Sequence, residues 1–354
     1  MAVIALVLIA VSRPSTVHRP ARMDYRGLAL IVTGIGLSVF GFQQASTWGW
    51  SNPAIGLCIA VGVAVLVVFA LVELRTDEPL MQVRIFAVRP FLVENMVLGI
   101  AMLAFVPVFF FASEYAQVSL AKSASGAGLF LLYFFLGFVV AAQIGGRMLD
   151  RTGAKRPVVI GCVLAAVGFG LWAGKVTTLS FSAQQWYVVV AGAGMGFLLG
   201  PASTDAVNRA SRLSYGEATG ITQTVRNYAA SLGLAILGTL LVTEMRSRLA
   251  TSLVAMGTPP ARAASEAATL AEGRAVASSA HGVATVPHVF ELDFAYATRS
   301  VLYAMAVVMA VAAVVAVVGL RRGVQEEPVE DDPVADGGSP SPPLDPVPST
   351  TPPG

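Results

Sequence analysis

The sequence predicts an all-α polytopic membrane protein, and three observations support this prediction. Hydrophobic residues make up 55% of the chain and charged residues only 12%, whereas a soluble domain usually carries about 25% charged residues. The mean hydropathy is +0.71. Eight stretches approach the roughly 20 apolar residues that a helix needs to cross a hydrocarbon core of about 30 Å. They lie near residues 28–48, 54–74, 91–113, 125–147, 157–174, 185–204, 218–243 and 299–320.

The segments outside these spans differ in character. Residues 246–298 are predicted to form a long loop, in which the run TPPARAASEAATLAEGRAVA is compatible with a helix. Residues 323–354 are acidic and rich in proline, so we expect a disordered tail, either regulatory or simply solubilising. The apolar run of residues 1–11 is too short to span a bilayer, and its cations follow it. A signal peptide has its cations first, so residues 1–24 are interpreted as the remnant of a preceding helix and a cytoplasmic loop.

The distribution of basic residues predicts the orientation. If the loop at residues 145–157 is cytoplasmic, cytoplasmic segments hold fifteen Lys and Arg residues and outer segments hold seven, as the positive-inside rule favours. The four tryptophans then fall at outer ends of spans, where an interfacial aromatic belt is expected. They are Trp48, Trp50, Trp172 and Trp186. The protein is therefore expected in the cell membrane with a cytoplasmic C-terminal tail.

Composition also argues against several function classes. A formal net charge of only +2 argues against a nucleic-acid-binding protein. None of the three histidines has a neighbouring cysteine or acidic cluster, so no metal site is predicted. A membrane enzyme would need acidic or histidine clusters near the membrane surface to hold a metal or activate a nucleophile. The sequence has no such cluster, so no catalytic residues and no cofactor are predicted.

Two predicted helices carry a small residue at every fourth position, a spacing that lets membrane helices approach closely. The positions are Gly137, Ala141 and Gly145 on one helix and Gly192, Gly196 and Gly200 on the other. Pro201 follows directly and removes a backbone donor, which favours a bend at that point. The alternative is that glycine and alanine are simply common in membrane helices.

A short charged segment, GGRMLDRTGAKRPV at residues 145–158, separates two apolar runs. Asp150 is expected at a helix C-terminus, where the helix dipole disfavours an anion, so it needs a cation or the positive end of another helix. Gly153 suits the left-handed conformation of a tight turn, and Pro157 suits the first turn of the next helix. An ordinary positive-inside loop would explain the cations but not the order of Gly, Asp and Gly.

The run GRMLDRTGAKR at residues 146–156 resembles the cytoplasmic loop signature of the major facilitator superfamily, usually written G-x-L-a-D-R-x-G-R-K. Leu149 and Ala154 depart from that pattern. Other runs resemble the fourteen-helix drug:proton antiporter branch of the family, among them MDYRGLAL, FALVELRTDEPLMQVRIF and AGAGMGFLLGPASTDAV. The resemblance implies two linking helices at residues 25–90 and a C-terminal six-helix bundle at residues 91–322, with the N-terminal helices missing. The chain would then be a truncated sequence or a genuine fragment.

The function implied by this resemblance is proton-coupled export of small hydrophobic or cationic molecules by alternating access between two halves. The proton gradient would supply the energy without a cofactor. The partners would be the lipid bilayer, a small-molecule substrate and the missing N-terminal half. The alternatives are export of a native metabolite or lipid, and a fragment that does not transport but serves as a partner for another half.

The resemblance also implies that the charged loop acts as a conformational latch. A charge contact of Asp150 would hold one state and release it when the two halves rock. The residues assigned to this latch are Gly146, Asp150, Arg151, Gly153, Lys155 and Arg156.

Ionisable residues inside spans are candidates for the substrate or proton pathway. Arg226 is expected about 12 Å along its helix, close to the middle of the membrane, where the resemblance also implies an arginine. Gln223 and Asn227 share its helix face and would line a polar cavity with it. The alternative is a structural arginine bonded to helix carbonyls.

Three acids complete the set of candidates. Glu94 and Asp205 are the possible counter-ions of Arg226 in this part of the protein, and an acid in the missing half is an equal alternative. Glu114 lies near the outer end of the helix that begins near Glu94, and its role is open. Each acid has the alternative interpretation of an interfacial group that reaches water.

Overall fold

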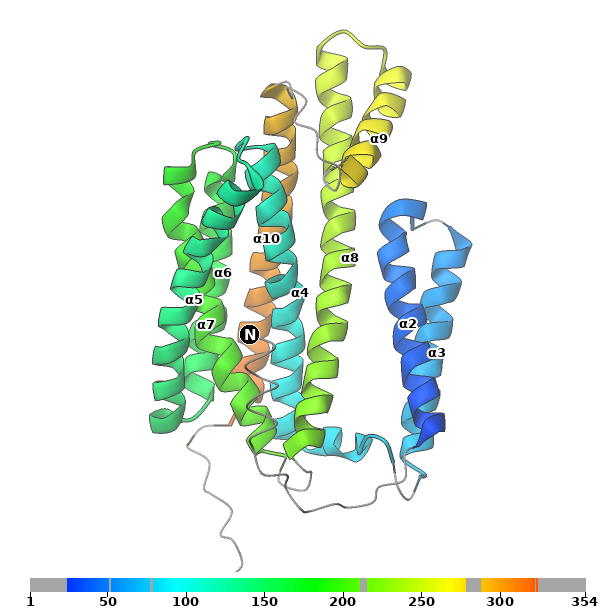
Figure 1. Cartoon of the computed structure of the whole chain (residues 1–354), viewed down its shortest axis with the longest axis vertical. Coiled ribbons are helices and arrows are strands. Elements are labelled where there is room, and N and C mark those ends of the chain that lie inside the picture. The colour runs from blue at the N-terminus through cyan, green and yellow to red at the C-terminus, as the bar shows by residue number, and fades with distance from the viewer. Residues whose placement is uncertain are drawn as a thin grey trace, which may run out of the picture. The chain divides into compact units, whose positions relative to one another are not determined.

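The computed structural model describes residues 24–50, 52–76, 79–210, 215–277, 288–321 and 323. Every element within these residues is helical (Figure 1). The elements are α2 (Tyr25–Trp48), α3 (Pro53–Glu73), the short 3-10 helix η1 (Val83–Ala87), α4 (Arg89–Val118), α5 (Ala124–Thr152), α6 (Lys155–Val176), α7 (Phe181–Asn208), α8 (Tyr215–Ala255), α9 (Pro260–Ala277) and α10 (His288–Gly319).

Eight of these helices are long and apolar enough to cross a membrane, as the sequence predicts. The boundaries differ from the expected ones at α8 and α10. Because α8 continues to Ala255 and α10 begins at His288, the loop expected at residues 246–298 is helical at both of its ends. The helix α9 occupies the run for which the sequence suggested a helix. The expected N-terminal remnant, up to residue 23, and the expected tail, beyond residue 323, lie outside the described residues.

The bundle has two ends, which we name by the elements found there. The turn between α5 and α6, the start of α4 and the end of α10 lie at one end, the turn end (Figure 1). The helix α9 lies at the opposite end, the α9 end.

Polar side chains and glycine fix where several helices begin and end. The Asp24 carboxylate accepts hydrogen bonds from two backbone N–H groups in the first turn of α2, at 2.9 and 3.0 Å. Asn52 and Ser123 cap α3 and α5 in the same way. These contacts satisfy N–H groups that have no partner inside the helix. Gly153 ends α5 with a φ of 77°, a conformation that glycine adopts without strain.

Glycines bring the backbones of α5, α6 and α7 into contact. A Cβ atom at Gly192 of α7 would collide with the Phe134 carbonyl of α5, and one at Gly196 with the Phe138 carbonyl. On the other side of α7, a Cβ at Gly161 of α6 would lie 2.7 Å from the Gly194 carbonyl oxygen. We call these paired contacts the glycine seam. The seam holds α7 between α5 and α6 at a distance that no larger residue allows.

The small-residue prediction is wrong at Gly200. No neighbouring atom of the described residues lies within 4 Å of the place where its Cβ would sit, and the residue is exposed. Pro201 lies inside α7 and is buried. The close approach of α5 and α7 therefore spans the first two glycines of the predicted repeat and not the third.

A buried polar network links α4, α6 and α7 near the α9 end. Tyr115 donates its hydroxyl proton to the Val176 carbonyl at 2.6 Å, and the Gln184 amide donates to the Tyr115 hydroxyl at 2.7 Å. The Trp172 indole N–H donates to the Gln184 amide oxygen at 3.2 Å. Trp172 is only 1% exposed, so the expectation that it belongs to an interfacial belt is wrong. Its N–H finds a partner inside the bundle instead of at the membrane surface.

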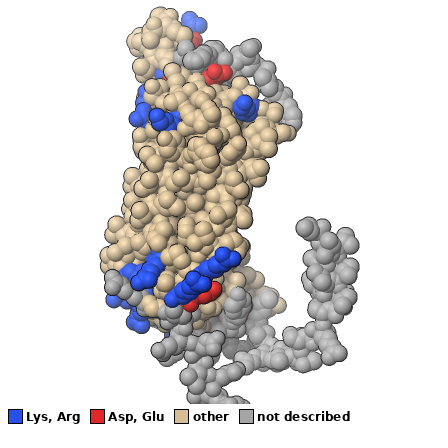
Figure 2. All heavy atoms as spheres, turned by 90° about the vertical axis from the view of Figure 1, so that its left-hand side faces the viewer, with Lys and Arg blue, Asp and Glu red and all other residues tan. Residues whose placement is uncertain are grey.

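The face of the bundle on the side of α5 and α6 has an uncharged middle. Figure 2, which faces the side of α5 and α6, shows charged residues near the two ends and a band without charge between them. Leu132, Leu136 and Val140 of α5 are more than half exposed in this band. Such a continuous apolar band is what a lipid-facing surface requires, since lipid is as apolar as leucine.

Candidate functional site

The charged loop forms a tight turn in which Asp150 is exposed. Gly153 donates its N–H to the Leu149 carbonyl at 2.9 Å and ends α5, and α6 begins two residues later. Arg151 and Arg156 are exposed as well. No hydrogen bond or ion pair of Asp150 occurs within the described part of the chain. A Cβ at Gly146 would meet no atom of the described residues within 4 Å, and it is Gly145 that lies against Phe197 of α7.

Lys155 connects this loop to the end of α10. Its ammonium group donates to the carbonyl oxygens of Val317 and Leu320, at 2.6 and 2.9 Å. The last carbonyls of a helix lack intrahelical partners and form its negative end, so a cation there contributes about 0.3–1 kcal/mol. The sequence showed the cation but not this partner, because the contact depends on how α6 packs against α10.

Two of the predicted acids, Glu94 and Asp205, are adjacent and buried. Glu94 lies in the second turn of α4 and is 1% exposed, and Asp205 lies on α7 and is 2% exposed. Asp205 pairs with Arg209 at 2.6 Å, and Glu94 is near enough to interact electrostatically with both. Among the described residues, neither carboxylate oxygen of Glu94 meets a hydrogen-bond donor, and the Asp205 carboxylate lies beside it. The sequence indicated both acids as candidates, but it did not indicate that they are neighbours in the fold.

Arg226 is half-buried on α8, eleven residues after the start of that helix. Its guanidinium donates to the Gln223 amide oxygen at 3.3 Å, while its buried Nε atom has no hydrogen-bond partner among the described residues. Gln223 and Asn227 are exposed, so the described residues do not enclose the expected cavity. The expected ion pair with Glu94 or Asp205 is absent from the described structure, since these acids group with Arg209 instead.

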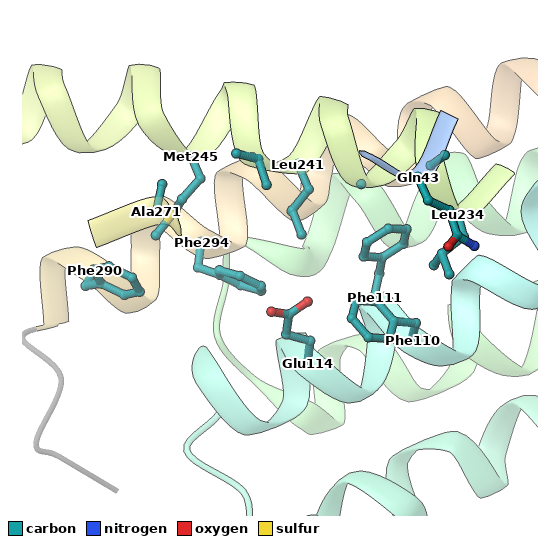
Figure 3. Close-up of a pocket in the computed structure, with 13 residues that line it drawn as sticks. Gln43, Phe110, Phe111, Glu114, Leu234, Leu241, Met245, Ala271, Phe290 and Phe294 are labelled. Carbon is teal, nitrogen blue, oxygen red and sulfur yellow. The ribbon is translucent and has the colours of Figure 1, made fainter. Parts of the chain in front are cut away.

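A pocket that the sequence did not reveal lies toward the α9 end (Figure 3). It has a volume of about 240 Å³ and collects residues from α2, α4, α8, α9 and α10. The Glu114 carboxylate points into it from α4, among aromatic rings. Glu114 was visible in the sequence as an acid inside a span, but its surroundings come from helices that are far apart in the chain.

Comparison with known proteins gives a family match and several relatives. The family described as "Major Facilitator Superfamily" matches residues 1–234. The chain is 29% identical over 230 residues to the puromycin resistance protein pur8 of Streptomyces alboniger, a stretch that covers 63% of this chain. It is 27% identical over 247 residues to the tetracenomycin C resistance and export protein of Streptomyces glaucescens, covering 69%. It is 28% identical over 244 residues to the multidrug resistance protein B homolog of Mycobacterium tuberculosis, covering 67%. The matched stretch is 45% of the length of each relative, so the chain matches about half of each.

Proposed function

Because the chain belongs to the Major Facilitator Superfamily, a family of membrane transporters and not of enzymes, we propose that it forms the C-terminal part of a proton-coupled exporter. The substrates would be small hydrophobic or cationic molecules. The observation that supports this most directly is the match to relatives named for antibiotic resistance and export. The chain would work by alternating access together with an N-terminal helical half, with the substrate between the two.

The acid pair at the turn end is our candidate for proton handling. Glu94 is buried, its carboxylate meets no hydrogen-bond donor among the described residues, and a second carboxylate, that of Asp205, lies beside it. An ionised carboxylate without partners is costly in a dry site, and a proton removes that cost. Glu94 is therefore suited to bind a proton in one state and to release it when water or a cation reaches it in another.

The charged loop is our candidate for the conformational latch. Asp150 is exposed at the C-terminal end of α5, where the helix dipole disfavours its charge. A contact with the positive end of a helix in the N-terminal half would stabilise it in one state only. Lys155 connects the same turn to α10 through its hydrogen bonds. Formation of the Asp150 contact would therefore act on α6 and α10 together.

We further propose that the turn end faces the cytoplasm and that the membrane is the cell membrane. The support is the excess of Lys and Arg in the segments at the turn end. The α9 end would then face outward.

The proposed function predicts that the 354-residue chain inserts but does not export by itself. Expressed in a host without its own efflux pumps, the chain alone should leave ethidium accumulation unchanged. The chain extended by the coding sequence upstream of codon 1 should lower accumulation, and a protonophore should abolish that effect. Export by the chain alone would contradict the two-half mechanism, and export that survives the protonophore would contradict proton coupling.

The latch predicts a specific effect of Asp150→Asn in the extended protein. The change keeps the shape of the side chain but removes its charge, and a charge-assisted hydrogen bond is worth about 1.5–3 kcal/mol. Transport in vesicles should therefore fall by about ten-fold or more at unchanged membrane insertion. Glu266→Gln, which removes a carboxylate that is 41% exposed on α9, is the matched control. Equal transport by Asp150→Asn and the control, at matched expression, would exclude the latch.

A further inference from the structure

The pocket toward the α9 end is partly open and is lined mainly by apolar side chains from several helices. Phe110 and Phe111 of α4, Leu241 and Met245 of α8, and Phe294 of α10 line it (Figure 3). Gly238 of α8 also borders the pocket, and the Phe111 ring lies 3.9 Å from the place where its Cβ would sit. The absence of a side chain at Gly238 thus helps to keep the space open.

One charged group faces this apolar space. Glu114 is the only charged residue among the described residues that line the pocket, and its carboxylate points toward the centre, between Phe111 and Phe294 (Figure 3). In the described parts of the chain it makes no hydrogen bond and no ion pair. A carboxylate among apolar groups lacks the solvation that water would give, so a cation that enters the pocket gains a strong electrostatic partner.

The aromatic rings favour the same kind of ligand. The face of a phenylalanine ring attracts a cation that lies within about 6 Å of its centre. Met245 adds a flexible and polarisable side chain that adapts to ligands of different shape. A neutral ligand would gain the apolar contacts but would leave the Glu114 carboxylate without a partner.

The size of the pocket limits the ligand. An apolar cavity of about 150 Å³ binds benzene, and this pocket has a volume of about 240 Å³. The space fits one aromatic ring together with a compact cationic group. The site is also distinct from the polar face at Arg226, because Gly238 lies twelve residues further along α8, or about 18 Å.

We propose that this pocket is a binding site for monovalent organic cations that carry an aromatic ring. The cationic group lies against the Glu114 carboxylate, and the ring lies among Phe110, Phe111 and Phe294. Binding needs only the helices described above, so the proposal does not depend on export. The proposed function places the substrate path between two halves of the transporter. The pocket between α4, α8 and α10 is a second, peripheral site in addition to that path.

The test measures binding of benzyltrimethylammonium to the purified 354-residue chain in an uncharged maltoside detergent, by ligand-observed NMR titration. Neopentylbenzene, which replaces the ammonium nitrogen by carbon, is the neutral ligand of the same shape. We expect the cation to bind about ten-fold or more tightly than the neutral ligand, and Glu114→Gln to lose that advantage. Glu266→Gln removes a carboxylate from α9 outside the pocket and should bind like the unchanged chain.

A second variant keeps the proposal testable if Glu114→Gln folds poorly. Gly238→Leu places a side chain in the pocket while Glu114 itself stays unchanged, and it should abolish binding of the cation. Thermal unfolding of each variant in the same detergent shows whether the bundle is intact. Equal affinity of the cation and the neutral ligand would overturn the role of Glu114. Undiminished cation binding by Gly238→Leu would show that the cation binds elsewhere. Neither outcome bears on export, because no gradient and no second half is present in the assay.

Discussion

Gly192→Leu is expected to abolish the folded bundle, whereas Gly200→Leu on the same helix should leave it intact. At Gly192 the first atom of any side chain would collide with the Phe134 backbone carbonyl of α5, and a backbone cannot move aside as a side chain can. Overpacking of a core that can partly adjust costs about 1–3 kcal/mol. The cost here should exceed that range, because α5 and α7 must separate.

Fluorescence-detected size-exclusion chromatography of the chain fused to a fluorescent protein measures this difference. Gly192→Leu should give aggregated or degraded material, and Gly200→Leu should give the same monodisperse peak as the unchanged chain. The pair is matched because both positions lie on α7 and receive the same residue. A monodisperse, thermally stable Gly192→Leu variant would show that the two helices are not in backbone contact.

The second large effect is expected at Arg226, in the two-half transporter that we propose. Arg226→Ala should abolish transport while the protein still inserts. An arginine at the centre of the membrane, where the sequence predicts Arg226, costs about 2.5–3.5 kcal/mol on insertion scales. Among the described residues the buried Nε atom of Arg226 has no hydrogen-bond partner. Among the described residues the Arg226 guanidinium has one hydrogen bond, to the Gln223 amide oxygen. A position that adds such a cost with so little compensation is expected to serve the proton or substrate pathway.

Transport in vesicles, normalised to the amount of folded protein in detergent, tests this role. Arg226→Lys should retain part of the activity because it keeps the charge. Arg262→Ala, at an exposed arginine on α9, is the control and should transport normally. Loss of folded protein in both Arg226 variants would identify a structural arginine. Normal transport by Arg226→Ala would exclude both roles.

The sequence predicts the helices well because hydropathy and length determine a span locally. It predicts the glycine contacts only in part, for a geometric reason. Four residues turn a helix by about 400°, so each step of the repeat shifts by about 40°, and Gly200 is rotated by about 80° from Gly192. A repeat of four therefore leaves the contact face within a few turns, and its third member points elsewhere.

The remaining features depend on which helices become neighbours. Nothing near Lys155 in the sequence indicates that its partners are the last carbonyls of α10, more than 160 residues away. The grouping of Glu94 with Asp205 and Arg209 requires α4 to lie beside α7. Hydropathy placed Trp172 at a helix end but could not show that Gln184 would bind its N–H inside the bundle.

The glycine seam has a mechanical consequence. Where two helices meet through side chains, a change of rotamers can absorb a small shift of one against the other. Where they meet backbone to backbone, as α7 meets α5 at Gly192 and α6 at Gly161, nothing in the contact can yield. The three helices α5, α6 and α7 should therefore move together as one rigid body. A movement of the α5–α6 turn would then move the opposite end of α7 by a similar amount.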